Sequence, residues 1–156
     1  LMKIRKGKKS DLPSILNLIK ELAHYERALD KVLITLNDLE KDGFGKHPLF
    51  WVLVAENENK IVGMAFYYIR YSTWSGKMFY LEDFVVKKGF RRMGVGSLLF
   101  EECIRVARKI NANGMVWQVL NWNKSAMNFY QKYNSELKSD WVNGKLNKEQ
   151  LNKLIL

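Results

Sequence analysis

The chain has 156 residues, 47% hydrophobic and 27% charged, a composition typical of a water-soluble globular protein with one buried core. No apolar run has the length of a membrane span and no signal peptide is recognisable, so we expect a cytoplasmic protein with no membrane partner. The single cysteine, Cys103, excludes an internal disulfide, and with only two histidines beside it we expect no metal site. We expect a single domain over residues 1–156.

Positive charge dominates the sequence. Lys and Arg number 26 against 16 Asp and Glu, a net charge of +10. Such an excess suits an anionic partner, which could be nucleic acid, a membrane surface or a phosphorylated cofactor. Much of it lies in two clusters, residues 3–9 and residues 87–92. We interpret the first cluster as a solvated basic surface.

The first half of the chain predicts a strand, two helices and three further strands. Residues 2–6 form the opening strand. Ser10-Asp11-Leu12-Pro13 then combines a capping residue with a first-turn proline and begins a helix. A short second helix is expected over residues 35–42, ending at Gly43-Phe44-Gly45. The three strands cover residues 49–56, 61–70 and 77–86, and the tight turns between them make them antiparallel neighbours.

The second half predicts alternating helices and strands. A long helix over residues 94–110 is followed by a strand over 114–120 and a helix over 123–133. The tail adds a strand around Trp141 and a short helix near Leu151. Because the strands at 77–86 and 114–120 flank a long helix, we expect them to be parallel. The fold class is therefore α/β, with a mixed sheet that is open at the parallel pair.

A glycine-rich motif lies where the strand ending at residue 86 gives way to the long helix. Residues 91–96, Arg-Arg-Met-Gly-Val-Gly, fit R-x-x-G-x-G. Glycine allows a sharp turn and a close ligand, and the helix start presents unpaired N–H groups and a positive dipole end. Both features favour phosphate or pyrophosphate. The spacing matches neither a P-loop nor the dinucleotide fingerprint. Taken alone, the motif is weak, because a glycine-rich turn that merely starts a helix is the commoner case.

Five segments in order place the motif in a family. They are "IKELAHYE", "DGFGKHPLF", "YSTWSGK", "YLEDFVV" with its R-x-x-G-x-G loop, and "WNKSAMNFYQK". Together they resemble the GNAT superfamily of acetyl-CoA-dependent N-acetyltransferases, and within it the spermidine/spermine (diamine) acetyltransferases. The resemblance implies a central mixed, mostly antiparallel sheet with a splayed parallel strand pair, flanked by helices. It also implies a homodimer.

The resemblance further implies where acetyl-CoA binds. Backbone groups of one strand would line the pantetheine arm, the loop after it would hold the diphosphate, and the next strand and helix start would contact the arm from the far side. The residues concerned are Phe84, Val85 and Val86; Arg91, Arg92, Met93, Gly94, Val95, Gly96 and Ser97; Val116, Trp117 and Gln118; and Asn123, Lys124, Ser125 and Ala126.

The implied reaction is direct attack of an amine on the thioester. An amine with a pKa of about 10 arrives protonated, and Glu82 would accept its proton through water. Tyr130, which also contacts the cofactor, would protonate the departing CoA thiolate, while a backbone N–H near residues 84–86 would polarise the thioester carbonyl. Strand alternation places Glu82 and Asp83 on opposite faces, so we expect only one of them in the site. Cys103 is expected in the core.

The resemblance places the amine substrate beside Tyr25, Glu26 and Trp74, with Glu82 at its reacting end. An acid beside two aromatic rings suits an ammonium ion. The alternative interpretation of Tyr25 and Glu26 is that they lie at the solvated end of a helix and bind nothing. The alternative for Tyr130 is an ordinary aromatic residue of the core.

Two departures from the polyamine enzymes bear on the acceptor. Ser72 stands where those enzymes tend to carry an acid, and the acidic loop before the last Trp is shortened to "ELKSDW". A shorter amine or an amino acid with a side-chain amine is therefore as plausible an acceptor as a polyamine such as spermine. A third departure, Asn134 in place of a glycine after the last major helix, should preserve the fold because Asn tolerates a left-handed cap.

Other functions remain open at this point. A protein lysine or N-terminal acetyltransferase would share the chemistry, and a CoA-binding sensor would share the fold. A nucleic-acid-binding protein would account for the positive charge, but the aromatic residues follow strand patterns that favour a core and no RNA-binding motif is present. We expect no specific nucleic-acid partner.

Overall fold

The computed structural model describes residues 1–156, which form two compact units, Leu1–Gln118 and Val119–Leu156. One domain over the whole chain stays a prediction. No helix combines the length and the apolar character that crossing a membrane requires.

The first unit is built on a five-stranded mixed sheet with strands in the order β1-β2-β3-β4-β5. Neighbours from β1 to β4 are antiparallel, and β4 and β5 are parallel, which confirms the predicted arrangement. The last strand is three residues long, shorter than the predicted 114–120. The strands are β1 (Met2–Lys6), β2 (Trp51–Asn57), β3 (Lys60–Ser72), β4 (Gly76–Val86) and β5 (Met115–Trp117).

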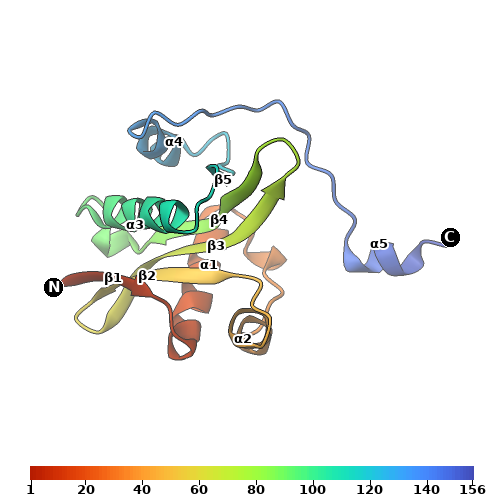
Figure 1. Cartoon of the computed structure of the whole chain (residues 1–156). Helices are drawn as coiled ribbons and strands as arrows, with labels where there is room; N and C mark the ends of the chain where they lie inside the picture. Colours follow the sequence, from red (N-terminus) through yellow and green to blue (C-terminus); the bar gives the residue numbers. More distant parts are fainter. The chain divides into compact units, whose positions relative to one another are not determined.

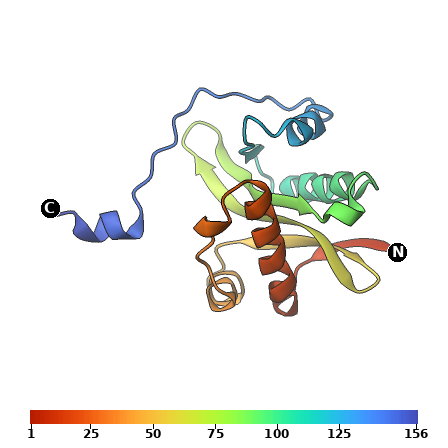
Figure 2. The same ribbon diagram turned by 180° about the vertical axis from the view of Figure 1, so that it is seen from behind.

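Helices cover both faces of this sheet. Figures 1 and 2 show α1 (Leu12–Tyr25) and α2 (Leu36–Phe44) on one face and α3 (Val95–Lys109) on the other. All three confirm predicted helices, with small shifts at their ends. Short 3₁₀ turns lie at Lys9–Asp11, Leu29–Lys31 and Lys88–Phe90.

The apolar stripes of these helices form the core. On the α1 face, side chains spaced three and four apart meet alternate residues of the strands, as amphipathic helices and pleated strands require. The buried members of this cluster include Leu12, Ile15, Leu18, Leu39, Val52, Val54, Met64 and Val85. On the α3 face, Leu99 and Cys103 are fully buried, so the prediction that Cys103 is a core residue is confirmed.

β4 carries a bulge at Glu82. Tyr67 of β3 pairs with Leu81, while the next residue, Phe66, pairs with Asp83, so Glu82 has no residue opposite it. A bulge interrupts the alternation of side chains along a strand. Asp83 therefore lies on the same face as Phe66, which packs against the α1-side core. The prediction that Glu82 and Asp83 occupy opposite faces rested on unbroken alternation, which the bulge interrupts at Glu82.

The second unit contains α4 (Lys124–Gln131) and α5 (Lys148–Lys153), which confirm the last two predicted helices. The strand predicted around Trp141 is absent. Residues 132–147 contain neither helix nor strand, and Trp141 is 81% exposed. A strand needs a neighbour to accept its hydrogen bonds, and no sixth strand joins the sheet. Asn134 has φ of 55°, which confirms its predicted left-handed conformation.

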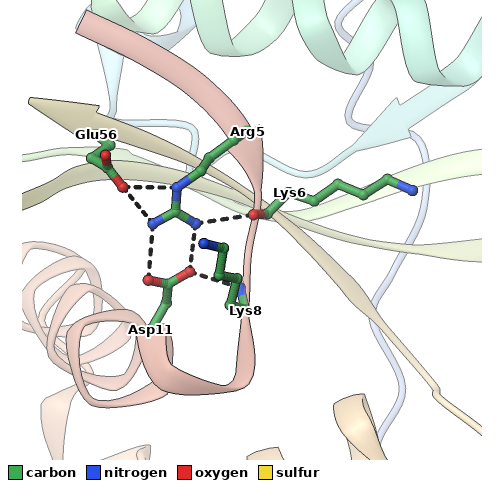
Figure 3. A network of polar contacts seen from close by, with 5 residues as sticks. All are labelled: Arg5, Lys6, Lys8, Asp11 and Glu56. Atoms are coloured by element: carbon green, nitrogen blue, oxygen red, sulfur yellow. Dashed lines mark hydrogen bonds and ion pairs between the residues drawn. The ribbon is translucent and has the colours of Figure 1, made fainter. Parts of the chain in front are cut away.

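A charged network joins the start of the chain to the sheet (Figure 3). The guanidinium of Arg5 on β1 lies between two carboxylates, Asp11 ahead of α1 and Glu56 on β2. Nη1 of Arg5 is 2.7 Å from Asp11 Oδ2, and the side chains of Arg5 and Asp11 are only 16% and 10% exposed. Asp11 also accepts a hydrogen bond from the backbone N–H of Lys8. The Arg5 hydrogen bond in particular lowers the pKa of Asp11.

We predict that Arg5→Met destabilises the protein by about 2–3 kcal/mol, because it leaves two largely buried carboxylates without their cation. Lys9→Met, which removes an exposed ion pair with Glu40, should cost less than about 1 kcal/mol. Urea unfolding at pH 7 measures both.

The Arg5 effect should also depend on pH. Because the pKa of Asp11 is lowered on folding, its stabilisation is present above about pH 4 and is lost as the pH falls through the folded-state pKa. An Arg5→Met penalty no larger than that of Lys9→Met would contradict the account.

Candidate active site

Three carboxyl groups gather where the end of α1 meets β4. Glu26 caps the C-terminus of α1, and Glu82 and Asp83 lie at the β4 bulge. Burial, followed by the negative charges of Glu82 and Glu26, raises the pKa of Asp83 to about 7. Burial also raises the pKa of Glu26 and that of Glu82. Carboxyl groups arranged in this way favour a cation beside them or a proton shared among them.

The position of Glu82 follows from the groups that its charge affects. The pKa values of Tyr68 and Tyr80 are raised by burial and then by the charge of Glu82. Tyr68 packs against the α1-side core, and its ring lies 4.9 Å from that of Tyr80. The charge of Glu82 therefore reaches Tyr68, Tyr80 and Asp83. Although the Glu82 residue as a whole is solvent-exposed, its carboxyl group is partly buried.

Beside the carboxyl groups, Tyr25 contacts the loop after β4. The guanidinium carbon of Arg91 lies 5.7 Å from the centre of the Tyr25 ring, a cation–π arrangement. Arg91 Nε also donates a hydrogen bond of 3.0 Å to the carbonyl oxygen of Val86, the last residue of β4. The first cation of the predicted phosphate motif is therefore held between the strand end and the helix that carries Glu26.

The phosphate loop, residues 91–97, has the backbone that its glycines predicted. Gly94 caps α3 in a left-handed conformation with φ of 80°, and Arg92 also has a positive φ of 61°. A Cβ atom added at Gly94 would meet no other protein atom within 4 Å. The first turn of α3 contains no acidic residue, and Arg91, Arg92 and Met93 are exposed. The backbone, open space and charge all fit a polyanion such as the diphosphate of CoA.

β4 and β5 part directly after their short pairing. Phe79, Tyr80 and Leu81 pair with Met115, Val116 and Trp117, and the pairing ends there. From Glu82 to Val86 the edge of β4 has no β5 residue beside it, while its other edge continues along β3. The edge formed by Phe84, Val85 and Val86 can therefore offer N–H and C=O groups to an extended ligand. Gln118 follows β5 directly, and the ring of Trp117 packs edge-on against Phe100 at 5.6 Å.

The remaining predicted site residues lie in the second unit. Asn123 caps α4, and its Oδ1 accepts a hydrogen bond of 3.2 Å from the backbone N–H of Ala126, so Lys124 and Ser125 form the first turn. Tyr130 is 6% exposed and its ring contacts that of Phe129. The Ser135 hydroxyl donates to the backbone carbonyl of Tyr130, which ties the chain after α4 back to the helix.

Trp74 lies away from the carboxyl groups of Glu82 and Asp83, contrary to the predicted substrate site. It lies in the turn between β3 and β4 and is 86% exposed. Glu82 is six residues along β4 from Gly76, which is about 20 Å at the rise of an extended strand. Sequence reasoning set aside Asp83 in favour of Glu82. A bulge has no reliable sequence pattern here, so the pair of adjacent acids was the only available indication.

Comparison with known proteins identifies the family. The family model "Acetyltransferase (GNAT) family" matches residues 13–134, which include α1 from its second residue onward, the phosphate loop and α4. The chain belongs to the GNAT acetyltransferase family. It is accordingly an N-acetyltransferase that uses acetyl-CoA, as the resemblance had predicted.

Two curated relatives are similar over most of this chain. The bovine thialysine N-epsilon-acetyltransferase is 40% identical over 136 residues, which cover 82% of this chain and 80% of the relative. The human spermidine/spermine N(1)-acetyltransferase-like protein 1 is 37% identical over 158 residues, 95% of this chain. The chain spans only 23% of the length of that human relative.

A solved structure confirms the GNAT fold. The aminoglycoside N-acetyltransferase AAC(6')-Iy in complex with CoA superposes with a TM-score of 0.77 at 19% identity, covering 94% of this chain and 95% of that one. The α/β fold predicted from the sequence, with its parallel pair at one side of a mixed sheet, is therefore confirmed.

We predict that Gly94→Ala weakens CoA binding about tenfold or more, because a Cβ at this left-handed position strains the loop and occupies space beside the helix N-terminus. Gly89→Ala is the matched control: Gly89 lies in the same loop region with open space around it and no positive φ. Isothermal titration with CoA measures both variants. Equal affinity in the two would show that the loop does not depend on the Gly94 conformation.

Proposed function

We propose that the chain transfers the acetyl group of acetyl-CoA to a primary amine of a small molecule by direct attack. The observation that carries this proposal is the juxtaposition of three carboxyl groups, Glu26, Glu82 and Asp83, with the open edge of β4. The carboxyl groups suit an ammonium ion, and the open edge and phosphate loop suit a long anionic cofactor. Acceptor and donor would thus meet along one strand.

The carboxyl groups would perform the proton transfer. A primary amine must lose a proton before it can attack, and a carboxyl group with a raised pKa is a better proton acceptor near neutral pH than an ordinary one. Glu82 is the proposed base, acting through water. Asp83, with a pKa of about 7, would hold the ammonium beside it and share the proton.

Two further groups would stabilise the reaction. Bound acetyl-CoA supplies the acetyl group as a thioester. A backbone N–H in the stretch Phe84–Val86 would donate to the carbonyl oxygen on which negative charge develops. Tyr130 Oη would hold the proton that the departing sulfur requires, since a thiolate with a pKa near 8.5 leaves more readily when protonated.

We propose an acceptor with a single side-chain amine rather than a long polyamine. Ser72 stands where an additional acid would help to bind a polycation, and the net charge of the chain is +10. The bovine relative is named for thialysine, an amino acid with a side-chain amine, whereas the human one is named for spermidine and spermine. A lysine side chain of a protein is the alternative acceptor with the same reacting group.

We also propose a homodimer, as in the diamine acetyltransferases that the sequence resembles. Apolar side chains of the tail are exposed in the single chain, among them Trp141 at 81% and Val142 at 96%. Burial of such side chains against a second copy would favour association. Light scattering distinguishes one chain from two.

The pH dependence should show the pKa of Asp83. We predict that kcat/KM for the amine rises with pH through about 7, because the ionised carboxylate attracts the ammonium and accepts its proton. Asp83→Asn should remove this inflection and lower kcat/KM at pH 8 about 10- to 100-fold, while the change near pH 10 from titration of the amine itself remains. Glu58→Gln, in the exposed β2–β3 turn, is the control. An unchanged inflection in Asp83→Asn would rule out this assignment.

Tyr130→Phe should lower kcat about 100-fold or more while leaving CoA affinity within about threefold, because only the phenolic proton is removed. Tyr133→Phe removes a phenol from the same part of the second unit and should leave kcat unchanged. Steady-state kinetics together with CoA titration tests both variants. Full turnover by Tyr130→Phe would disprove its role as the acid.

A further inference from the structure

A row of side chains continues from the carboxyl groups along the α1 face of the β3–β4 hairpin. Next to Glu82 are the paired rings of Tyr80 and Tyr68, 4.9 Å apart. Beyond them is Arg70, whose guanidinium carbon lies 5.6 Å from the centre of the Tyr80 ring. Arg70 is two residues from Tyr68 on β3, so both side chains leave the same face of the strand. The row therefore has anions at one end, aromatic rings in the middle and a cation at the other.

The charges at the two ends of the row shift the pKa values of the same two tyrosines in opposite directions. The charge of Glu82 raises the pKa values of Tyr68 and Tyr80, and the charge of Arg70 lowers them. Tyr80 and Glu82 are two residues apart on β4, which corresponds to about 7 Å in an extended strand. Because Arg70 lies over the Tyr80 ring, this ring separates the cation from the acids, and the short methylene chain of an amino acid with a side-chain amine would lie against it.

Arg70 is suited to bind a carboxylate. The residue is exposed, its guanidinium is held over the Tyr80 ring, and none of the ion pairs of the protein involves it. A guanidinium presents a planar set of N–H donors that matches a carboxylate with two parallel hydrogen bonds. The same charge would repel the second ammonium group of a diamine lying along the row.

We propose that Arg70 is a specificity-determining residue that binds the carboxylate of an amino-acid acceptor, whose side-chain amine reaches Glu82 and Asp83 across the Tyr68–Tyr80 pair. This inference rests on the proposed function and adds to it the class of acceptor and the residue that selects it. The tyrosine rings would contact the methylene chain, and Arg70 would distinguish an amino acid from the diamine of the same length.

Two pairs of acceptors test the proposal, because the members of each pair differ only in the carboxylate: ornithine with putrescine, and lysine with cadaverine. For the wild type we expect higher kcat/KM for the amino acid in at least one pair. Arg70→Met should lower kcat/KM for that amino acid about 10- to 100-fold, while kcat/KM for the matching diamine stays the same or rises, because the repulsion of its second ammonium group is removed. Arg70→Lys should be intermediate, because it keeps the charge without the planar donor set.

The control variant is Lys77→Met. Lys77 pairs with Tyr71, one position along from the Arg70–Met78 pair, so its side chain leaves the opposite face of the same hairpin. The substitution therefore removes a positive charge from the hairpin without changing the α1 face. Lys77→Met should leave the ratio of kcat/KM for the amino acid to kcat/KM for the diamine unchanged. Thermal unfolding of each variant verifies that the hairpin is intact.

The outcomes separate the inference from the function on which it rests. If the wild type acetylates these amines but Arg70→Met leaves the ratio of kcat/KM for amino acid to diamine unchanged, the role of Arg70 is overturned. The same holds if Arg70→Met lowers kcat/KM equally for both members of a pair. Acetyl transfer to small amines is unaffected by either result. Preference of the wild type for diamines also overturns the role of Arg70. No acetylation of any of the four amines overturns both the inference and the small-amine proposal.

Discussion

The geometry of β4 is the constraint on which the site depends. This strand pairs with β3 along nearly its whole length but with β5 over only three residues, and it carries a bulge where that second pairing ends. The parting of β4 from β5 leaves one edge of β4 without a strand beside it, and the bulge places Asp83 opposite Phe66 on the α1 face. The loop of residues 91–97 follows β4 directly, so the proposed acceptor, thioester and diphosphate sites succeed one another along the chain.

The carboxyl cluster is acidic, whereas the chain as a whole is strongly basic. A cluster of acids with raised pKa values is unfavourable for folding once ionised, because burial and mutual repulsion oppose the charge. The cluster is nevertheless held by a rigid core on the α1 side. The chain elsewhere is strongly basic, which suits attraction of an anionic cofactor to the exposed Arg91 and Arg92. In the proposed function, the acidic cluster binds the amine and the basic loop binds the anionic cofactor.

Much of the fold could be predicted from the sequence because its elements have strong local patterns. Leu12-Pro13 begins α1, and tight turns separate β2, β3 and β4, so the antiparallel order followed directly. The Arg-x-x-Gly-x-Gly spacing likewise predicted a sharp turn ahead of α3, where Gly94 is the N-cap. These features depend on residues near one another in the chain.

The features that escaped prediction depend on distant residues. The bulge at Glu82 arises from the pairing of β4 with β3, and no alternation rule locates it. The strand expected at Trp141 required an edge with which to pair, which periodicity does not reveal. Arg70 stands out only once the hairpin places it over Tyr80.

The most direct test of the account is release of CoA thiol from acetyl-CoA in the presence of putrescine, spermidine, spermine, lysine, thialysine and a lysine-containing peptide. The account predicts turnover with a small molecule that carries a side-chain amine, and weaker activity with spermine. Tight acetyl-CoA binding without turnover on any small amine would contradict the small-amine proposal and favour a protein acceptor or a sensor. Absence of acetyl-CoA binding would contradict the assignment of the cofactor site, because residues 91–97 would then be only a turn before a helix.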